Sequence, residues 1–227
     1  MTAAKLCFIL HPVCLGVFGL EMQLGALLLA IGAFWLGACP FSVWIGRWLL
    51  GKDIRDYGDS NPGAANVRRA GGRKAFVLAA ILDTAKGMPF VILAHSLFRL
   101  PDPIVLAIGI CPILGHAFSP LLGLRGGKAI GVTMGVLIAL PQHYMLIAFL
   151  IFMLLGYLFI EIDAWVVMLG ATGSLVYLVA TRGGSWETLF MLCVLAILAT
   201  KHFEDLKTIP RFKGKLIRWL QPVKRQI

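Results

Sequence analysis

The residues best suited to chemistry in this sequence lie in a polar, glycine-rich stretch from Gly51 to Lys74, between two long apolar segments. Arginines and lysines stand here beside aspartates and asparagines, and the glycines allow backbone N–H groups to approach a ligand closely. Such a loop suits a phosphate-bearing ligand at a membrane surface. The alternative is a basic loop whose arginines only set the orientation of the neighbouring helices.

A second polar stretch, residues 123–129, contains Gly126, Gly127 and Lys128. Paired glycines expose backbone donors and a lysine adds a compact charge, so these three residues are typical of a phosphate cradle, although the signal is weak when taken alone. The stretch is not a Walker A loop, because Leu122 and Ala129 stand where that motif has Gly and Ser or Thr. We therefore do not expect a nucleoside triphosphate as ligand.

A third candidate group, His202 and Asp205, follows the last apolar segment. Their spacing places both side chains near one face of a helix, and a histidine beside a carboxylate can orient or deprotonate a hydroxyl group. The plainer interpretation is a surface histidine at a helix end. The other histidines near helix ends have no partner in the sequence and are interpreted as structural: His11, His95 and His143.

The composition places these three stretches in a membrane protein. Of the 227 residues, 59% are hydrophobic, against about 45–50% in soluble domains, and the mean hydropathy is +0.86. The net charge of +10 comes from segments between helices, so a nucleic-acid partner is not expected. The cysteines are scattered through apolar segments without metal-ligand spacing, so no metal or cofactor is expected either.

Seven apolar segments predict an all-α fold with about seven transmembrane helices. Pro40 should bend the first of them, because proline removes an intrahelical hydrogen bond. Residues 1–21 are interpreted as an extension or weak signal sequence, residues 22–205 as the helical domain and residues 206–227 as a basic tail, and translation from Met22 is an alternative start. The segments are Leu24–Leu50, Phe76–Phe98, Ile104–Leu122, Ile130–Leu140, Tyr144–Ile160, Ala164–Ala180 and Thr188–Thr200.

Charges within and between these segments add two predictions. Asp83 and Lys86, three residues apart in an apolar run, can neutralise each other on one helix face and are expected to face or brace the site. The loop 51–74 and the tail after Thr200 hold most of the basic residues, so these and the 123–129 loop are predicted to be cytoplasmic, with the N-terminus outside.

Taken together, the three polar stretches resemble motifs of the bacterial membrane-integral acyltransferases that transfer an acyl group from acyl-phosphate to glycerol-3-phosphate. The first family motif reads roughly Gly-Ser-Ile-Pro, then Asp-Ile-Arg, then Gly-Ser-Gly-Asn-x-Gly-Ala-Thr-Asn-Val-x-Arg, followed by Asp-x-x-Lys-Gly. The second reads Gly-His-x-Phe, then Gly-Gly-Lys-Gly. The matching segments cover residues 24–205 in the expected order: residues 37–40, 53–55, 58–68, 83–87, 115–118 and 126–128.

The resemblance implies a cytoplasmic bowl in the inner membrane of a bacterial cell, in which acyl-phosphate and glycerol-3-phosphate react without a metal or a covalent enzyme intermediate. It implies phosphate binding by Arg55, Asn66, Gly126, Gly127 and Lys128, catalysis by His202 and Asp205, and structural support by Asp83, Lys86 and His116. We expect a monomer. The product would be lysophosphatidic acid, a precursor in phospholipid synthesis.

Several positions depart from the family pattern. Ala38 stands where the family has a phosphate-binding serine, Ala65 where it has threonine, Ala129 where it has glycine, and Asp205 where it has asparagine. A glutamate expected in the tail and a substrate-contacting serine expected near residues 166–174 have no clear match. These departures leave two alternatives open: a non-catalytic or transport-like relative that keeps the anion site, or an acyltransferase with a different polar acceptor.

Overall fold

The computed structural model describes residues 3–213, with side chains from Glu21 onward. Its regular structure within these residues is helical, apart from one isolated bridge between Ile160 and Phe212. The α-helices are α1 Ala3–Ala38, α2 Phe41–Leu50, α3 Ala64–Arg69, α4 Arg73–Ala85, α5 Pro89–Ile92, α6 Asp102–Ala117, α7 Ile130–Ala139, α8 His143–Phe159, α9 Asp163–Arg182, α10 Trp186–Lys201 and α11 Phe203–Leu206. Short 3-10 turns cover Ile54–Asp56 and Pro120–Leu122, and a π-helical turn covers Leu93–Leu97.

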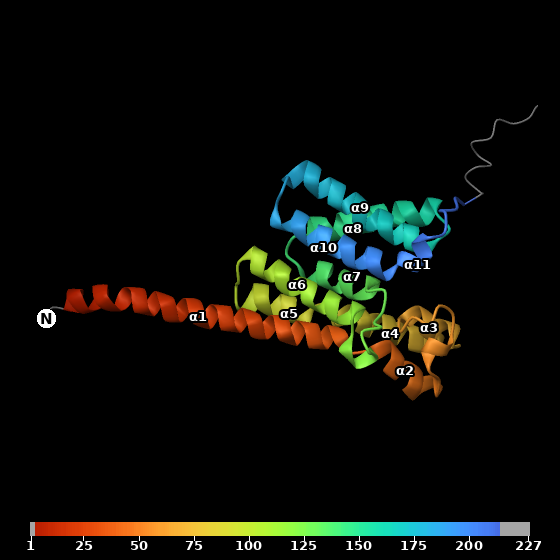
Figure 1. Ribbon diagram of the computed structural model, residues 1–227, viewed down its shortest axis with the longest axis horizontal. Helices are drawn as coiled ribbons and strands as arrows, with labels where there is room; N and C mark the ends of the chain where they lie inside the picture. Colours follow the sequence, from red (N-terminus) through yellow and green to blue (C-terminus); the bar gives the residue numbers. More distant parts are fainter. Residues whose placement is uncertain (1–2, 214–227) are drawn as a thin grey trace, which may run out of the picture.

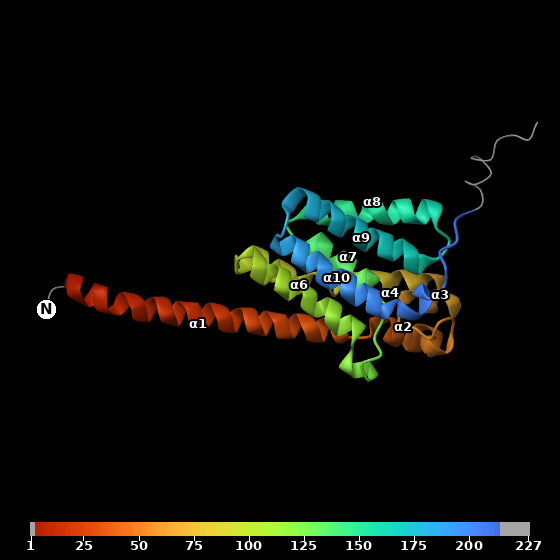
Figure 2. The same ribbon diagram turned by 45° about the horizontal axis from the view of Figure 1, so that its top comes forward.

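The seven apolar segments are all helical, which confirms the all-α prediction. Among the described residues, four stretches are long and apolar enough to cross a membrane: Glu21–Leu50, Arg73–Leu97, Asp102–Leu122 and Asp163–Arg182. The segments Ile130–Ala139 and His143–Phe159 are shorter apolar helices. The first helix does not begin near Met22, because α1 runs continuously from Ala3 and projects well beyond the other helices (Figures 1 and 2).

Pro40 does more than bend the first segment, because the helix stops at Ala38 and α2 starts anew at Phe41. The break frees backbone carbonyls that would otherwise accept hydrogen bonds inside a helix. Side chains from distant segments satisfy two of them: Ser119 Oγ donates to the Ala38 carbonyl at 2.6 Å, and Lys86 Nζ donates to the Cys39 carbonyl at 2.8 Å. The break is therefore held by tertiary contacts.

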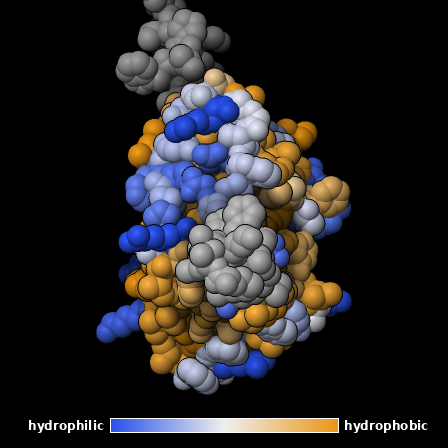
Figure 3. All heavy atoms as spheres, turned by 90° about the vertical axis from the view of Figure 1, so that its left-hand side faces the viewer, coloured by the Kyte–Doolittle hydropathy of each residue, from blue (hydrophilic) through white to orange (hydrophobic). Residues whose placement is uncertain are grey.

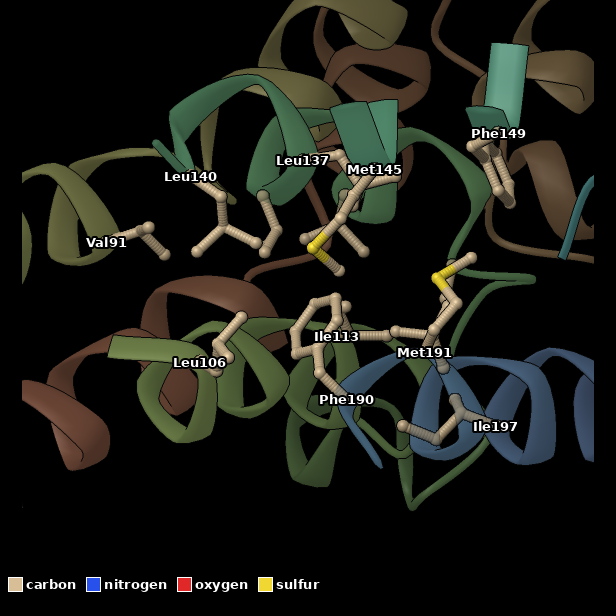
Figure 4. Close-up of a cluster of buried hydrophobic side chains, with 14 of the residues drawn as sticks. Val91, Leu106, Ile113, Leu137, Leu140, Met145, Phe149, Phe190, Met191 and Ile197 are labelled. Carbon is tan, nitrogen blue, oxygen red and sulfur yellow. The ribbon is translucent and has the colours of Figure 1, made fainter. Parts of the chain in front are cut away.

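The main hydrophobic core lies between α1, α5, α6, α7, α8, α9 and α10. Its side chains point toward one another in Figure 4, where Ile113, Phe190 and Met191 face Leu137 and Met145. Outside this core, large apolar side chains remain exposed along whole helices, as on α8. Viewed from the end where α1 projects, hydrophobic residues cover much of the surface (Figure 3). An apolar exterior around an apolar core is typical of a protein embedded in lipid.

One end of the bundle collects all three polar stretches. A small second core of Val43, Ile45, Ile54, Val67 and Ala79 packs α2, α3 and the 3-10 turn at residues 54–56 against α4. The loop before α7 and the turn after α10 reach the same end, as the ion pairs of Lys128 show. Residues far apart in the sequence therefore share one site.

Candidate functional site

A cavity of about 1310 Å³ opens at this end of the bundle. It is bounded by the loop before α3, the first part of α7, the start of α9 and the region around α11, with α4 contributing Ala80 and Thr84. Its lining combines apolar residues with charged ones, as a site for an amphipathic substrate requires. The ionisable residues that line it are Asp59, Arg69, Asp83, His116, Lys128, Glu161, Asp163, His202, Glu204, Asp205 and Arg211.

Lys128 lies at the centre of the charged part of this cavity. Its Nζ lies 2.6 Å from Asp59 Oδ2 and 2.7 Å from Asp205 Oδ2, so one ammonium joins the first and third polar stretches. Burial alone would lower the pKa of Lys128, but the hydrogen bonds to Asp205 and Asp59 raise it above its ordinary value. Lys128 is therefore a fixed positive charge.

Asp59 is held in place by the short helix α3. Asn66 donates from Nδ2 to Asp59 Oδ1 at 3.0 Å and to the Asn61 carbonyl at 2.9 Å, and Arg69 donates to Asp59 Oδ1 at 3.1 Å. Arg69 also donates to Asn66 Oδ1 at 2.7 Å. Burial would raise the pKa of Asp59, but Lys128 and Asn66 lower it, so the side chain is a carboxylate at neutral pH.

Gly58 makes this arrangement possible. Its φ of 60° lies in the left-handed region, and a Cβ there would lie 2.6 Å from both the Arg69 side chain and Asn66 Oδ1. Ser60, two residues after Gly58, also has a positive φ, of 57°. The two unusual positions turn the Asp59 backbone so that its carboxylate faces Lys128.

His202 follows the last residue of α10 and is only 2% exposed. Its Nδ1 lies 3.7 Å from Asp205 Oδ2, beyond hydrogen-bond distance, and neither ring nitrogen has a partner among the described residues. Burial and the charge of Lys128 lower the pKa of His202, against the opposing effect of Asp205. A neutral, unpartnered imidazole that lines a cavity is available to bind or deprotonate a ligand.

The tail reaches the same cavity. Glu161 N donates to the Arg211 carbonyl at 2.9 Å, and Trp165 Nε1 donates to the Thr208 carbonyl at 2.8 Å, so residues 208–211 lie against the start of α9. Part of the segment predicted as a basic tail is therefore a wall of the site. The rest of that segment, residues 214–227, lies outside the described residues, as does part of the range in which the missing glutamate was sought.

Asp83 and Lys86 form the buried pair that their spacing predicts, with Nζ and Oδ1 2.8 Å apart. Ser42 donates to the other oxygen of Asp83, and Lys86 holds the Cys39 carbonyl. The pair thus connects the floor of the cavity to the break between α1 and α2. Asp83 itself lines the cavity.

Gly126 and Gly127 pack on His116 and are not among the described residues that line the cavity. A Cβ on Gly126 would lie 1.9 Å from the His116 carbonyl oxygen, and one on Gly127 would lie 2.2 Å from His116 Nε2. Gly127 N also donates to the His116 carbonyl at 3.0 Å. The paired glycines thus permit a close backbone approach to His116 directly before Lys128, and the N–H of Gly127 is bonded to the His116 carbonyl.

Arg55 is occupied elsewhere. Its guanidinium makes two hydrogen bonds to Asp53, at 2.9 and 2.6 Å, which raise its pKa, and Asp53 also accepts from Arg47 at 2.9 Å. Within the described part of the chain, Arg69 and not Arg55 is the arginine of the 51–74 loop that lines the cavity. Asn66, 1% exposed, lies behind the lining and positions Asp59 and Arg69.

The departure from the family pattern that matters most at this site was missed in the sequence. Ala38 is buried at the end of α1, away from the described lining. Asp59, however, falls at the second position of the Gly-Ser-Gly-Asn pattern, where a serine stands, and it contacts Lys128. Counting along the same pattern places Arg69 at its final arginine, so a stricter alignment of this motif would have found both residues.

Several properties of the cavity limit the chemistry. Among the described residues, no group of three or more His, Cys, Asp or Glu side chains is arranged to hold a metal ion. The lining includes three cations, Arg69, Lys128 and Arg211; two of them, Lys128 and Arg69, meet at Asp59, and His202 adds a neutral imidazole. This set can bind an anionic group and accept a proton from a hydroxyl.

Comparisons with known proteins identify the family of the chain. A family profile described as glycerol-3-phosphate acyltransferase matches residues 27–211. Among curated relatives, a glycerol-3-phosphate acyltransferase of Listeria welshimeri is 28% identical over 88% of this chain and 100% of its own length. One from Deinococcus radiodurans, named glycerol-3-phosphate acyltransferase 1, is 32% identical over 83% of this chain and 93% of its own length.

A solved structure gives the same result. The crystal structure of PlsY, an integral membrane glycerol 3-phosphate acyltransferase, in its glycerol 3-phosphate form, superposes with a TM-score of 0.73 at 26% identity. The match covers 86% of this chain and 99% of that chain, and the lysophosphatidic acid form gives a TM-score of 0.71. This chain is a multi-pass integral membrane protein, and it belongs to the glycerol-3-phosphate acyltransferase family.

Proposed function

We propose that this protein transfers an acyl group from acyl-phosphate to the sn-1 hydroxyl of glycerol-3-phosphate and so forms lysophosphatidic acid for phospholipid synthesis. The observation that carries this proposal is the position of Lys128. Its ammonium joins Asp59, 69 residues away in the sequence, to Asp205. The imidazole of His202, which has no hydrogen-bond partner within residues 21–213, lines the same cavity, and the cavity also has apolar walls. The family of the chain supports the reaction type.

Phosphate groups would bind to Lys128 and Arg69. Both side chains line the cavity and both now contact carboxylates, which resemble phosphate oxygens in charge and in hydrogen-bond acceptance. Asn66 would keep Arg69 in position through its 2.7 Å hydrogen bond. Arg55 would stabilise the loop and not bind phosphate, because its guanidinium is hydrogen-bonded to Asp53.

His202 and Asp205 would carry the proton transfer. The acceptor oxygen bonds to the acyl carbonyl carbon, the bond between that carbon and the phosphate oxygen breaks, and inorganic phosphate leaves. The hydroxyl proton passes to His202, which is neutral because burial and Lys128 lower its pKa. Asp205 then stabilises the imidazolium from across the 3.7 Å gap, while Lys128 stabilises the departing phosphate.

The site would open to the cytoplasm of a bacterial cell, in the inner membrane. The predicted orientation rests on the excess of basic residues in the stretches that share this end of the bundle. A cysteine introduced at the exposed Ser60 should resist an impermeant reagent in intact cells, whereas one at the exposed Ser96, in the π-helical turn far from the site, should react. The reverse labelling pattern would contradict the orientation.

The reaction itself can be tested with purified full-length protein in lipid. Incubation with palmitoyl-phosphate and glycerol-3-phosphate should yield lysophosphatidic acid and inorganic phosphate in equal amounts. Palmitoyl-coenzyme A in place of palmitoyl-phosphate should give no product, because the proposed donor site recognises phosphate on the acyl carbonyl. Binding of glycerol-3-phosphate without turnover would instead identify a non-catalytic relative, and turnover of another polyol phosphate would identify a different acceptor.

A further inference from the structure

Both cations proposed to bind phosphate are already occupied by carboxylates. Asp59 contacts Lys128 at 2.6 Å and Arg69 at 3.1 Å, and Asp205 contacts Lys128 at 2.7 Å. Within the described residues, Asp59 contacts both cations, whereas Asp205 contacts Lys128 alone. It therefore lies where a phosphate group bound by both would place an oxygen.

We infer that Asp59 is a specificity-determining residue that competes with the substrate phosphate for Lys128 and Arg69 and must be displaced before phosphate binds. This inference rests on the proposed function, because it assumes that phosphate binds at these two cations. Competition with Asp59 limits which anions can bind. An anion that forms only one weak contact cannot replace Asp59, whereas a phosphate dianion with several acceptor oxygens can.

Charge balance supports the inference. With Asp59 and Asp205 in place, the two cations and two carboxylates of this cluster sum to zero. A phosphate dianion added without displacement would lie beside two like charges, which repel it strongly in a partly buried site. Moving Asp59 away frees both cations for the phosphate and removes one repelling charge.

Asp59 can move towards solvent. Its side chain is 33% exposed, whereas Asn66, which holds it, is 1% exposed. Asp59 is therefore bound at the edge of the cluster, and its release towards solvent leaves the Asn66 to Arg69 hydrogen bond intact. A carboxylate that can leave and return would also help to expel inorganic phosphate after each acyl transfer.

The test is the affinity of the substrate-free protein for inorganic phosphate, measured by calorimetry on the full-length protein in lipid. Asp59→Asn removes the competing charge but keeps an oxygen that can accept from Asn66. We expect phosphate to bind at least tenfold more tightly to this variant, and to inhibit its turnover at a correspondingly lower concentration. Asp59→Ser carries the same prediction and replaces Asp59→Asn should that variant fail to fold.

Two comparisons make the result specific. Asp56→Asn removes the same charge from an exposed position of the same loop and should change phosphate affinity less than twofold. In a Lys128→Ala background the gain from Asp59→Asn should shrink, because one of the two contested cations is gone. Unchanged or weaker phosphate binding in folded Asp59 variants, an equal gain in Asp56→Asn, or an undiminished gain without Lys128 would each overturn the inference.

The binding measurement is independent of catalysis. Tighter phosphate binding in Asp59→Asn without lysophosphatidic acid formation by the wild type would refute the proposed reaction and leave the competition established. Acyl transfer by the wild type, together with phosphate binding that is unchanged in the Asp59 variants, would support the proposed reaction and refute the competition.

Discussion

The ammonium of Lys86 lies 2.8 Å from the carbonyl oxygen of Cys39, at the point where Pro40 separates α1 from α2. The same ammonium is paired with Asp83, a cavity residue. One buried contact thus connects the break in the first membrane segment to the floor of the site. The consequence is that the shape of the cavity depends on a charge outside its catalytic cluster.

Replacing Lys86 by alanine should strongly destabilise the protein, because it leaves the buried carboxylate of Asp83 without its counterion and removes the side-chain donor to the Cys39 carbonyl. Breaking a buried pair typically costs about 3–5 kcal/mol. Thermal unfolding in detergent measures the loss. Lys207→Ala provides the comparison, since its pair with Glu204 is exposed and such pairs contribute less than about 1 kcal/mol. Equal losses in the two variants would show that Lys86 has no bracing role.

The two arginines of the 51–74 loop should behave differently. Arg69→Ala removes a charged contact to phosphate, worth roughly 1.5–3 kcal/mol, so the KM for glycerol-3-phosphate or for acyl-phosphate should rise by about tenfold to a hundredfold. Arg55→Ala leaves the cavity lining unchanged and should alter KM by less than threefold while lowering stability through the loss of the Asp53 pair. Steady-state kinetics for both substrates decide the question, and a larger kinetic defect in Arg55→Ala would reverse our assignment.

The pH dependence of kcat/KM should report the state of His202. Since burial and Lys128 lower its pKa below the usual value of about 6.5, the imidazole is neutral at pH 7, and activity should fall only as the pH drops through that lowered pKa. Asp205 and Asp163 act in the opposite direction and raise the pKa. Asp205→Asn should therefore move the acid limb of the profile to still lower pH.

Titration of the substrate phosphate affects the wild type and the variant alike, so the difference between their profiles isolates the enzyme group. Asp56→Asn serves as the control, because its exposed side chain is not a cavity residue, and its acid limb should coincide with that of the wild type. A limb that moves to higher pH in Asp205→Asn would mean that His202 is not the group being titrated.

The sequence was sufficient to predict helices and the membrane class, because apolar runs of this length have few other solutions. The resemblance to the family also implied that His202 and Lys128 share one site, and both residues line the cavity. The sequence could not distinguish Arg55 from Arg69. Both belong to one basic loop, and the choice depends on Asp53, which caps the 3-10 turn at residues 54–56, and on the short helix α3, which places Arg69 beside Asp59.

The partner of Asp205 is a second feature that could not be predicted from the sequence. The two lysines closest to Asp205 along the chain are Lys201 and Lys207. In the structure Lys207 pairs with Glu204, and the partner of Asp205 is Lys128, from a loop that only the packing of α7 against its neighbours brings near. Such contacts depend on tertiary structure and cannot be predicted from residues that are close along the chain.

The central claim is that acyl transfer takes place in this cavity and depends on the imidazole of His202. The most direct test is the kcat for lysophosphatidic acid formation in His202→Ala, with His143→Ala as the matched control, an exposed histidine at the start of α8. General base catalysis contributes typically about 10²–10⁴-fold, so kcat should fall at least about a hundredfold in His202→Ala and stay unchanged in His143→Ala, with both proteins folded. A folded His202→Ala variant that retains wild-type turnover would contradict the account.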